Sequence, residues 1–283
     1  MRLVLAALFL LQAIYAQPQR IVSTSPGITE TLFALGLGPR VVGVSNYCRY
    51  PPEVLKLPKV GTYLKPDAEL IARLSPDLVF VHKLPNDLAA RLAALGIHSA
   101  EVELGTLPKL FTSIETVGKA AGAEPQARKL IAGIQTRLNN VRQAAASLPK
   151  PKVLFIVGRR PGTLSDLVVV GSDSYLNELI RTAGGINALD QSSMPAYPRI
   201  SLETVIRLNP DFILDTATPM GDGGATEQNR MAIEALWQEQ KELTAARNYH
   251  VRTLGSDAFV IPGPRVVEVV ELLYGILHPQ GAR

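Results

Sequence analysis

The chain has 283 residues, of which 47% are hydrophobic and 19% are charged, and its formal net charge is +4. This apolar content is too high for a disordered chain and is enough for one large core or two modest cores. The Lys and Arg residues are scattered, whereas a nucleic-acid-binding surface normally gathers them in a stripe or a run. We therefore expect a globular protein without a nucleic-acid partner.

The first 16 residues have the layout of a secretory signal peptide. Arg2 precedes a stretch from Leu3 to Ile14 that is apolar except for Gln12, and the small residue Ala16 stands before a polar segment. The stretch is shorter than the ~20 residues that a membrane-spanning helix needs. Cys48 is the only cysteine, so no internal disulfide can form and no cysteine follows the stretch to carry a lipid. We expect cleavage after Ala16 and a free protein in the periplasm.

Residues 17–121 alternate between short β-branched runs and helical patterns, which predicts an N-terminal lobe with a parallel sheet flanked by helices. The expected strands are Ile21–Ser23, Val41–Val44, Leu78–Val81 and His98–Val102. The expected helices, with apolar residues at helical spacing, are Thr29–Leu35, Ala68–Leu74 and Asp87–Leu95.

Residues 122–151 predict a single long linker helix. From Pro125 to Leu148 the apolar positions fall on one helical face, namely Leu130, Ile134, Leu138 and Val141. Pro125 suits a first helical turn, and Pro149 ends the pattern. At ~1.5 Å per residue the helix is about 35 Å long, so we expect a stiff strut between two lobes.

Residues 152–283 repeat the alternation and predict a C-terminal lobe. Its expected strands are Val153–Val157, Leu167–Val170, Phe212–Leu214 and His250–Leu254, and its expected helices include Tyr175–Thr182, Glu203–Leu208 and Val266–Leu277. The predicted fold class is therefore α/β, with two Rossmann-like lobes whose sheets are of the parallel type, joined by one long helix.

Two stretches, Ala68–Phe80 and Leu202–Leu214, match each other and indicate that the lobes are copies of one fold. Each has a glutamate in the first helical turn, Glu69 or Glu203, and an x-Pro-Asp turn that leads into a strand. The helix dipole alone favours a carboxylate in that position. A matched pair on two lobes also suits two basic sites on a two-fold symmetric partner. The two interpretations are equally supported by the residues alone.

Four stretches resemble a known family: Ile21–Glu30, Val42–Pro52, Glu69–Val79 and Ser201–Asp211. They are similar to the periplasmic binding proteins for vitamin B12, haem and ferric siderophores, whose lobes are joined by one long helix. The likeness runs over nearly all of the chain after residue 16. It implies a monomer that holds a transported ligand between its lobes and delivers it to the permease dimer of an ABC importer, without catalysis and without a cofactor or metal of its own.

The resemblance also implies roles for individual residues. Glu69 and Glu203 match lobe-surface glutamates that pair with permease arginines, which favours the docking interpretation. The ligand-lining positions of the family fall on Tyr47, Tyr63, His82, Asp257 and Phe259, and the loop residue Tyr197 is a further candidate. Where members that bind vitamin B12 carry two tryptophans and a pocket arginine, this chain has Tyr63, His82 and Ile261.

These side chains suit a corrinoid, because a wide, flat ring needs aromatic faces and a few orienting polar groups. Haem or a ferric siderophore is the alternative ligand, since Arg159 and Arg160 suit carboxylates. His82 could ligate a metal in the ligand or serve only as a hydrogen-bonding group. The sequence contains no nucleophile elbow, phosphate-binding loop or zinc-protease motif, so a secreted enzyme is a remote alternative.

Overall fold

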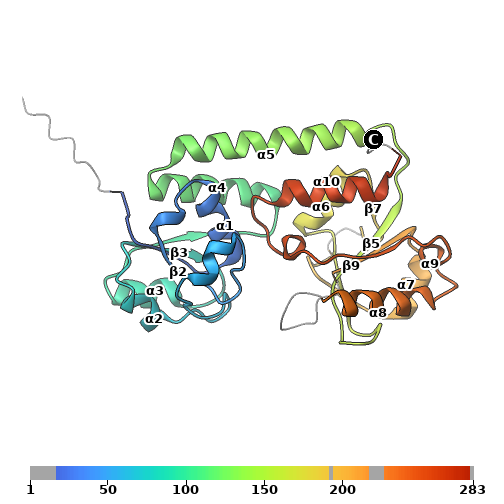
Figure 1. Cartoon of the computed structure of the whole chain (residues 1–283), viewed down its shortest axis with the longest axis horizontal. Helices are drawn as coiled ribbons and strands as arrows, with labels where there is room; N and C mark the ends of the chain where they lie inside the picture. The colour runs from blue at the N-terminus through green and yellow to red at the C-terminus, as the bar shows by residue number, and fades with distance from the viewer. Residues whose placement is uncertain (1–16, 191–193, 217–225, 281–283) are drawn as a thin grey trace, which may run out of the picture.

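The structure is a computed structural model that describes residues 17–190, 194–216 and 226–280. The predicted signal peptide, residues 1–16, lies outside this range. Figure 1 shows two α/β lobes side by side, with the long helix α5 (Glu124–Ala145) running along both of them. In the part of the chain that is described, no helix is both long and apolar enough to cross a membrane.

The N-terminal lobe is built on a four-stranded parallel sheet with the order β2-β1-β3-β4. The strands are β1 (Ile21–Ser23), β2 (Val41–Val44), β3 (Leu78–His82) and β4 (Ser99–Val102). The helices are α1 (Pro26–Ala34), α2 (Ala68–Arg73), α3 (Leu88–Ala94) and α4 (Leu107–Ala121), with short 3-10 helices η1 (Gly38–Arg40) and η2 (Pro52–Lys56).

Both faces of this sheet are covered, which explains why its central strands are apolar runs. Ile21 and Phe80 pack with residues of α1 and α4 on one face. Val22 and Val79 pack with residues of α2 and α3 on the other face. Because α5 contributes to the first of these cores, α2 and α3 lie on the side of the sheet away from α5.

Helix α5 joins the lobes and packs against both. It contacts α4 of the N-terminal lobe and α6 and α10 of the C-terminal lobe through one buried face. Gly118 of α4 allows a close approach, since a Cβ there would lie 2.5 Å from the Cβ of Ala127. The helix begins one residue before the predicted Pro125 and ends at Ala145 instead of Leu148. The lobe boundaries at residues 121 and 152 stay a prediction.

The described residues of the C-terminal lobe form a six-stranded sheet in the order β10-β9-β5-β6-β8, with β7 also paired to β5. The strands are β5 (Lys152–Gly158), β6 (Leu167–Val169), β7 (Ile186–Asn187), β8 (Arg199–Ile200), β9 (Phe212–Asp215) and β10 (Val251–Thr253). The helices are α6 (Tyr175–Thr182), α7 (Leu202–Leu208), α8 (Glu227–Gln238), α9 (Thr244–Arg247), η3 (Asp257–Val260) and α10 (Val266–Leu277).

The predicted α/β class is confirmed, and the second sheet is mixed rather than wholly parallel. Strand β6 runs antiparallel to β5 and to β8, whereas β7, β9 and β10 are in parallel pairs. The loop 159–166 between β5 and β6 explains the reversal. It is too short for a crossover connection, which needs about a dozen residues or more.

The helices α4 and α8, like the short α9, are not among those predicted from the sequence. Helix α4 begins at the N-cap Thr106, whose hydroxyl accepts a hydrogen bond from the Lys109 backbone N, and ends at Gly122 with φ 70°. Helix α8 begins at Thr226, which accepts from the Asn229 backbone N. Helices α4 and α8 both begin with the side-chain cap that is typical of helices.

The two matching sequence stretches fold alike. Helix α2 leads into β3, which pairs with β1, and α7 leads into β9, which pairs with β5, both in parallel. Between helix and strand the backbone turns through a left-handed residue, Ser75 with φ 46° and Asn209 with φ 43°. The duplicated scaffold predicted from the sequence is therefore present in the structure.

Candidate ligand-binding cleft

Three predicted ligand residues form a cluster in the N-terminal lobe. Tyr47 follows β2, Tyr63 lies between β2 and α2, and His82 ends β3. The Tyr47 and Tyr63 rings meet edge to face with centroids 5.9 Å apart, and Tyr63 stacks on His82 at 6.3 Å. We call these three residues the N-lobe ring cluster. It lies beyond the carboxyl ends of parallel strands, where ligands bind in open α/β sheets.

The N-lobe ring cluster offers aromatic surface to solvent. Tyr47 is 38% exposed and Tyr63 is 36% exposed. Partial burial lowers the pKa of His82 below its ordinary value. Its imidazole is therefore neutral at neutral pH and has a ring nitrogen with a free lone pair for a metal or a hydrogen-bond donor.

Tyr197 provides an aromatic group in the C-terminal lobe. It precedes β8, and its hydroxyl accepts a hydrogen bond from Ser174 Oγ at 3.2 Å. Burial raises the pKa of Tyr197, the Ser174 hydrogen bond lowers it, and the phenol of Tyr63 raises it further. The ring of Tyr197 is 42% exposed, so it offers aromatic surface in the C-terminal lobe.

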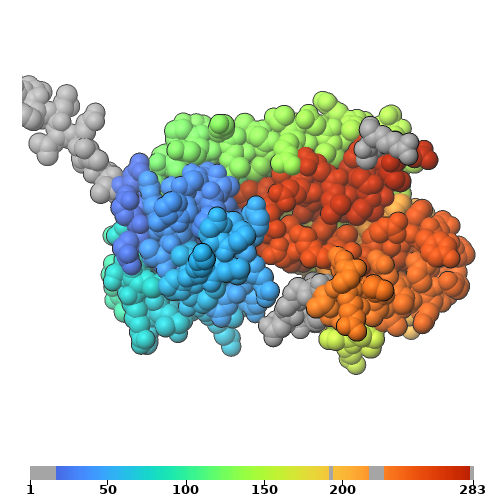
Figure 2. Space-filling view, viewed as in Figure 1, coloured from blue at the N-terminus to red at the C-terminus, as the bar shows by residue number. Residues whose placement is uncertain are grey.

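A cavity of about 370 Å³ is lined by residues that are close in sequence to Ser174 and Tyr197. It is lined by Ser172, Asp173, Met194 and Pro195. Figure 2 shows a notch between the lobes on the side away from α5. The N-lobe ring cluster and Tyr197 are the aromatic groups that the two lobes offer to a candidate cleft.

The two predicted ligand residues of η3 differ in their surroundings. The side chain of Asp257 is 35% exposed and accepts a hydrogen bond from Arg265 Nη1 at 2.9 Å. Phe259 is only 1% exposed, its ring packs on Phe155 at 5.7 Å, and its carbonyl accepts from Tyr175 Oη. A direct ligand contact of the Phe259 ring stays a prediction, and it requires η3 to move.

Three residues that the sequence did not indicate, Arg265, Glu30 and Tyr50, form a group beside Asp257 in which Arg265 contacts the other two. Arg265, just before α10, donates to both carboxylate oxygens of Glu30 on α1, and its guanidinium lies 4.3 Å from the ring centre of Tyr50. Arg265 and Glu30 are 235 positions apart in the chain. No local pattern could have related them.

The two arginines at the carboxyl end of β5 are not equivalent. Arg159 is buried, and its Nε lies 3.4 Å from the carboxylate of Asp215, which also accepts from Trp237 Nε1. Burial lowers the pKa of Arg159, and the Asp215 charge acts in the opposite direction. Arg160 is exposed and pairs with Asp166. Of these two arginines, Arg159 is therefore the buried cation.

Glu69 and Glu203 occupy equivalent places in the first turns of α2 and α7, and both are exposed. Val205 of α7 packs in a core separate from the one that contains α5, as Ile71 of α2 does. Both helices therefore lie on the sides of the sheets away from α5 (Figure 1). A hydrogen bond from Ser201 lowers the pKa of Glu203, which keeps it ionised.

Within the described ranges, no three His, Cys, Asp or Glu side chains gather as they would around a metal ion. The candidate ligand groups are the tyrosines, His82, the Ser174 and Tyr197 hydroxyls and the Asp257 carboxylate. This set can hold a flat ring between aromatic faces and fix its polar edges by hydrogen bonds.

Comparison with known proteins gives one family and several relatives. The family described as periplasmic binding protein matches residues 21–258. An uncharacterized ABC transporter substrate-binding lipoprotein, YvrC of Bacillus subtilis, is 31% identical over 93% of this chain and 81% of its own length. The crystal structure of the periplasmic vitamin B12 binding protein BtuF of Vibrio cholerae has a TM-score of 0.76 and 27% identity, covering 93% of this chain and 98% of that one. The periplasmic heme-binding protein RhuT of Roseiflexus sp. RS-1, in apo form, has a TM-score of 0.76 and 27% identity, covering 91% of this chain and 98% of that one.

Proposed function

Because this chain belongs to the periplasmic binding protein family, we propose that it captures a corrinoid in the cleft between its lobes and delivers it to an ABC importer. The observation that carries the proposal is the pair of aromatic surfaces in the two lobes. The N-lobe ring cluster presents Tyr47 and Tyr63, and the C-terminal lobe presents the partly exposed ring of Tyr197. A wide, flat, largely apolar ring is the kind of ligand that such surfaces bind.

The polar groups near these rings suit the edge of a corrinoid. Its side-chain amides are hydrogen-bond donors, and the Asp257 carboxylate is a partly exposed acceptor. The Ser174 and Tyr197 hydroxyls form a second polar group on the C-terminal wall. The protein is proposed to release its ligand chemically unchanged, so its action is binding and delivery rather than catalysis.

We propose that delivery uses Glu69 and Glu203. Each is an exposed carboxylate on the same helix of a duplicated lobe, which supports a contact with one basic site on each subunit of a permease dimer. Neither residue belongs to the cleft. Docking and ligand binding are therefore expected to be separable by mutation.

We also propose that the mature chain begins at Gln17 and is a monomer in the periplasm. The test is N-terminal sequencing of the protein recovered from a periplasmic fraction, together with light scattering of the purified protein. An N-terminus other than Gln17, or a stable dimer, contradicts the corresponding part of this proposal.

The ligand is tested by titrating purified protein with cyanocobalamin, dicyanocobinamide, haemin and a ferric siderophore, with visible absorbance and equilibrium dialysis as readouts. Cyanocobalamin and dicyanocobinamide are expected to bind. Mass spectrometry after denaturation is expected to return the ligand unmodified. Binding of haemin or the siderophore alone overturns the corrinoid assignment, and a modified product overturns the non-enzymatic role.

Haem is the second candidate, and two observations favour it. The neutral imidazole of His82 can donate a lone pair to iron, and the buried cation Arg159 suits a propionate. If haem is the ligand, His82→Ala is expected to change the Soret band of the complex. The same substitution is expected to leave the corrin absorption bands unchanged if a corrinoid binds by ring contacts.

A further inference from the structure

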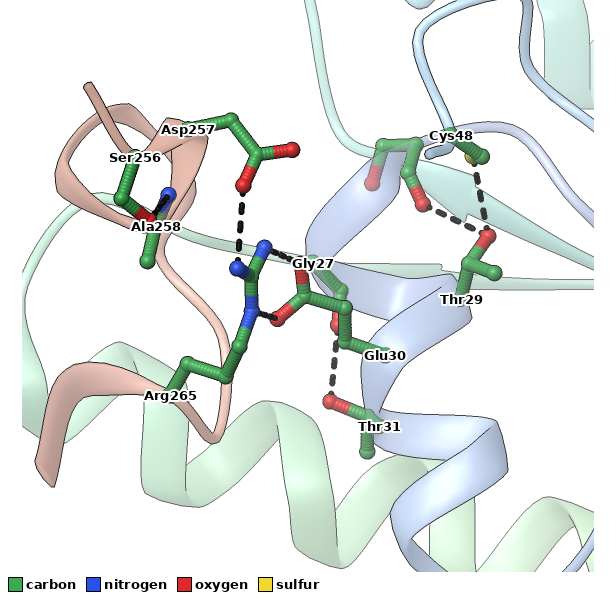
Figure 3. A network of polar contacts seen from close by, with 10 residues as sticks. Gly27, Thr29, Glu30, Thr31, Cys48, Ser256, Asp257, Ala258 and Arg265 are labelled. Carbon is green, nitrogen blue, oxygen red and sulfur yellow. Dashed lines mark hydrogen bonds and ion pairs between the residues drawn. The ribbon is translucent and has the colours of Figure 1, made fainter. Parts of the chain in front are cut away.

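A buried ion pair joins the two lobes. Glu30 of α1 is 4% exposed and Arg265 of the C-terminal lobe is 8% exposed. Arg265 Nε donates to Glu30 Oε2 at 3.0 Å, and Arg265 Nη2 donates to Oε1 (Figure 3). Two parallel hydrogen bonds of this kind fix the relative orientation of the guanidinium and the carboxylate.

The same guanidinium reaches two groups beside the cleft. Its Nη1 donates to Asp257 Oδ1 at 2.9 Å, and its central carbon lies 4.3 Å from the ring centre of Tyr50. Asp257 is a candidate ligand residue, and Tyr50 lies in the same loop as Tyr47. One cation therefore connects a buried anchor in the first lobe to a carboxylate and an aromatic ring at the cleft.

The backbones around this pair lie too close for a side chain. A Cβ on Gly27 of α1 would lie 2.4 Å from the carbonyl oxygen of Pro262. A Cβ on Gly263 would lie 2.9 Å from Glu30 Oε2. The lobes are thus in direct contact here, and any larger residue would separate them.

Two further hydrogen bonds cross between the lobes at the start of α6. The backbone N of Tyr175 donates to the carbonyl of Gly105 at 2.9 Å, and the backbone N of Leu107 donates to Glu178 Oε1 at 3.3 Å. With α5, these contacts restrain the angle between the lobes. In the Glu30–Arg265 pair both partners are charged and buried, and a buried charge that loses its partner is strongly destabilising.

We propose that Arg265 is a positioning residue for ligand binding: by pairing with Glu30 it fixes the angle between the lobes, and by pairing with Asp257 it holds that carboxylate ready to accept a hydrogen bond from the ligand. The proposal rests on the proposed function for the ligand step alone. A cleft that is already ordered binds more tightly, because less conformational freedom is lost on binding.

The test compares Arg265→Ala, Arg265→Lys and Glu30→Gln with the unsubstituted chain. Arg137→Ala is the matched control, because Arg137 forms an exposed two-bonded pair with Glu271 between α5 and α10. Spin labels at Ala94→Cys after Cys48→Ser, paired with Glu239→Cys, report the distance between the lobes. Cyanocobalamin affinity is measured on the same variants without labels.

The ligand-free variants Arg265→Ala and Glu30→Gln are expected to give a broader distance distribution than the unsubstituted chain, and Arg137→Ala is not. Their cyanocobalamin affinity is expected to fall roughly tenfold or more, because binding must then order the cleft. Asp257→Asn is expected to weaken binding without broadening the distances. If Arg265→Ala does not fold, the distances and affinities of Arg265→Lys and Glu30→Gln test the proposal, because these substitutions preserve side-chain size better.

Unchanged distances in the folded variants overturn the proposal whatever ligand the protein binds. Broadened distances with unchanged cyanocobalamin affinity overturn its ligand step. If cyanocobalamin does not bind the unsubstituted chain, the corrinoid assignment fails, and the distance measurement still tests the role of Arg265 between the lobes.

Discussion

Asp77 and Asp211 make the same hydrogen bond in the two lobes. Asp77 Oδ2 accepts from the Arg20 backbone N at 2.9 Å, just before β1. Asp211 Oδ2 accepts from the Lys152 backbone N at 2.7 Å, at the start of β5. Each aspartate follows the proline of the x-Pro-Asp turn, so the turn connects the end of a helix to the entry of the neighbouring strand.

The side chains of the same two basic residues complete the match. Arg20 Nη2 donates to the carbonyl of Leu74 at 2.7 Å, and Lys152 Nζ donates to the carbonyl of Leu208 at 3.1 Å. In both lobes a basic residue therefore satisfies a carbonyl at the C-terminus of the preceding helix. The sequence repeat thus encodes a structural joint that is present twice.

Removing one of these carboxylates is expected to destabilise the protein modestly. Asp211→Ala leaves the Lys152 backbone N without its partner and should cost about 1–2 kcal/mol, or roughly 2–4 °C in midpoint temperature. Asp211→Asn keeps an acceptor oxygen and should cost less. Thermal unfolding followed by circular dichroism is the measurement, with the exposed Glu115→Ala as control. Equal midpoints for Asp211→Ala and the unsubstituted chain contradict the prediction.

Local pattern predicted the elements whose apolar residues form clear runs or helical stripes. The predicted bounds of α6 and α10 agree with the structure, and the x-Pro-Asp turns identified the duplicated lobes. The direction of β6 was wrong because burial makes a strand apolar whichever way it runs. The length of the preceding loop, 159–166, carried the information instead.

The candidate site was predictable only in part. The resemblance pointed to Tyr47, Tyr63 and His82, which the structure brings together. The sequence did not indicate a role for Arg265, because its partner Glu30 is 235 residues away and has the pattern of an ordinary helical glutamate. Pairing across lobes depends on the finished tertiary structure, which no local spacing records.

Charge reversal at the two docking glutamates should abolish uptake without changing ligand affinity. Glu69→Arg with Glu203→Arg replaces attraction to a basic permease site by repulsion on both lobes. Uptake of labelled cyanocobalamin by cells and affinity of the purified protein are measured in parallel. Glu115→Arg with Glu239→Arg provides the same charge change at exposed acids elsewhere. Persisting uptake in the first double variant, or equal loss in the second, rules out the docking role.

The thiol of Cys48 is expected to be unreactive in the folded protein. Burial raises the pKa of Cys48 to about 11, although a hydrogen bond with Thr29 at 3.1 Å lowers it. At neutral pH the thiolate fraction is then on the order of one in ten thousand, and the thiolate is the reactive form. A chromogenic disulfide reagent should label the thiol only after urea is added. Fast labelling of the native protein shows that the thiol is accessible and ionised.

The stability of the protein should decrease on mild acidification, in part through His82. Burial lowers the pKa of His82 in the folded state, whereas the unfolded chain has the ordinary value near 6.5. The unfolded state therefore binds the proton more readily. The stabilisation is complete above about pH 6.5 and is lost as the pH falls through the folded pKa. His278, whose pKa is also lowered by burial, adds to the effect.

Urea unfolding between about pH 7.5 and about pH 5 measures this contribution. Of the two histidines whose pKa burial lowers, His82→Gln removes one and leaves His278. The loss of unfolding free energy across that range should therefore become smaller in this variant without disappearing. The exposed His98→Gln serves as the control and should keep the full loss. An identical pH dependence in His82→Gln and the unsubstituted chain contradicts the prediction. It means that folding does not disfavour protonation of the His82 ring.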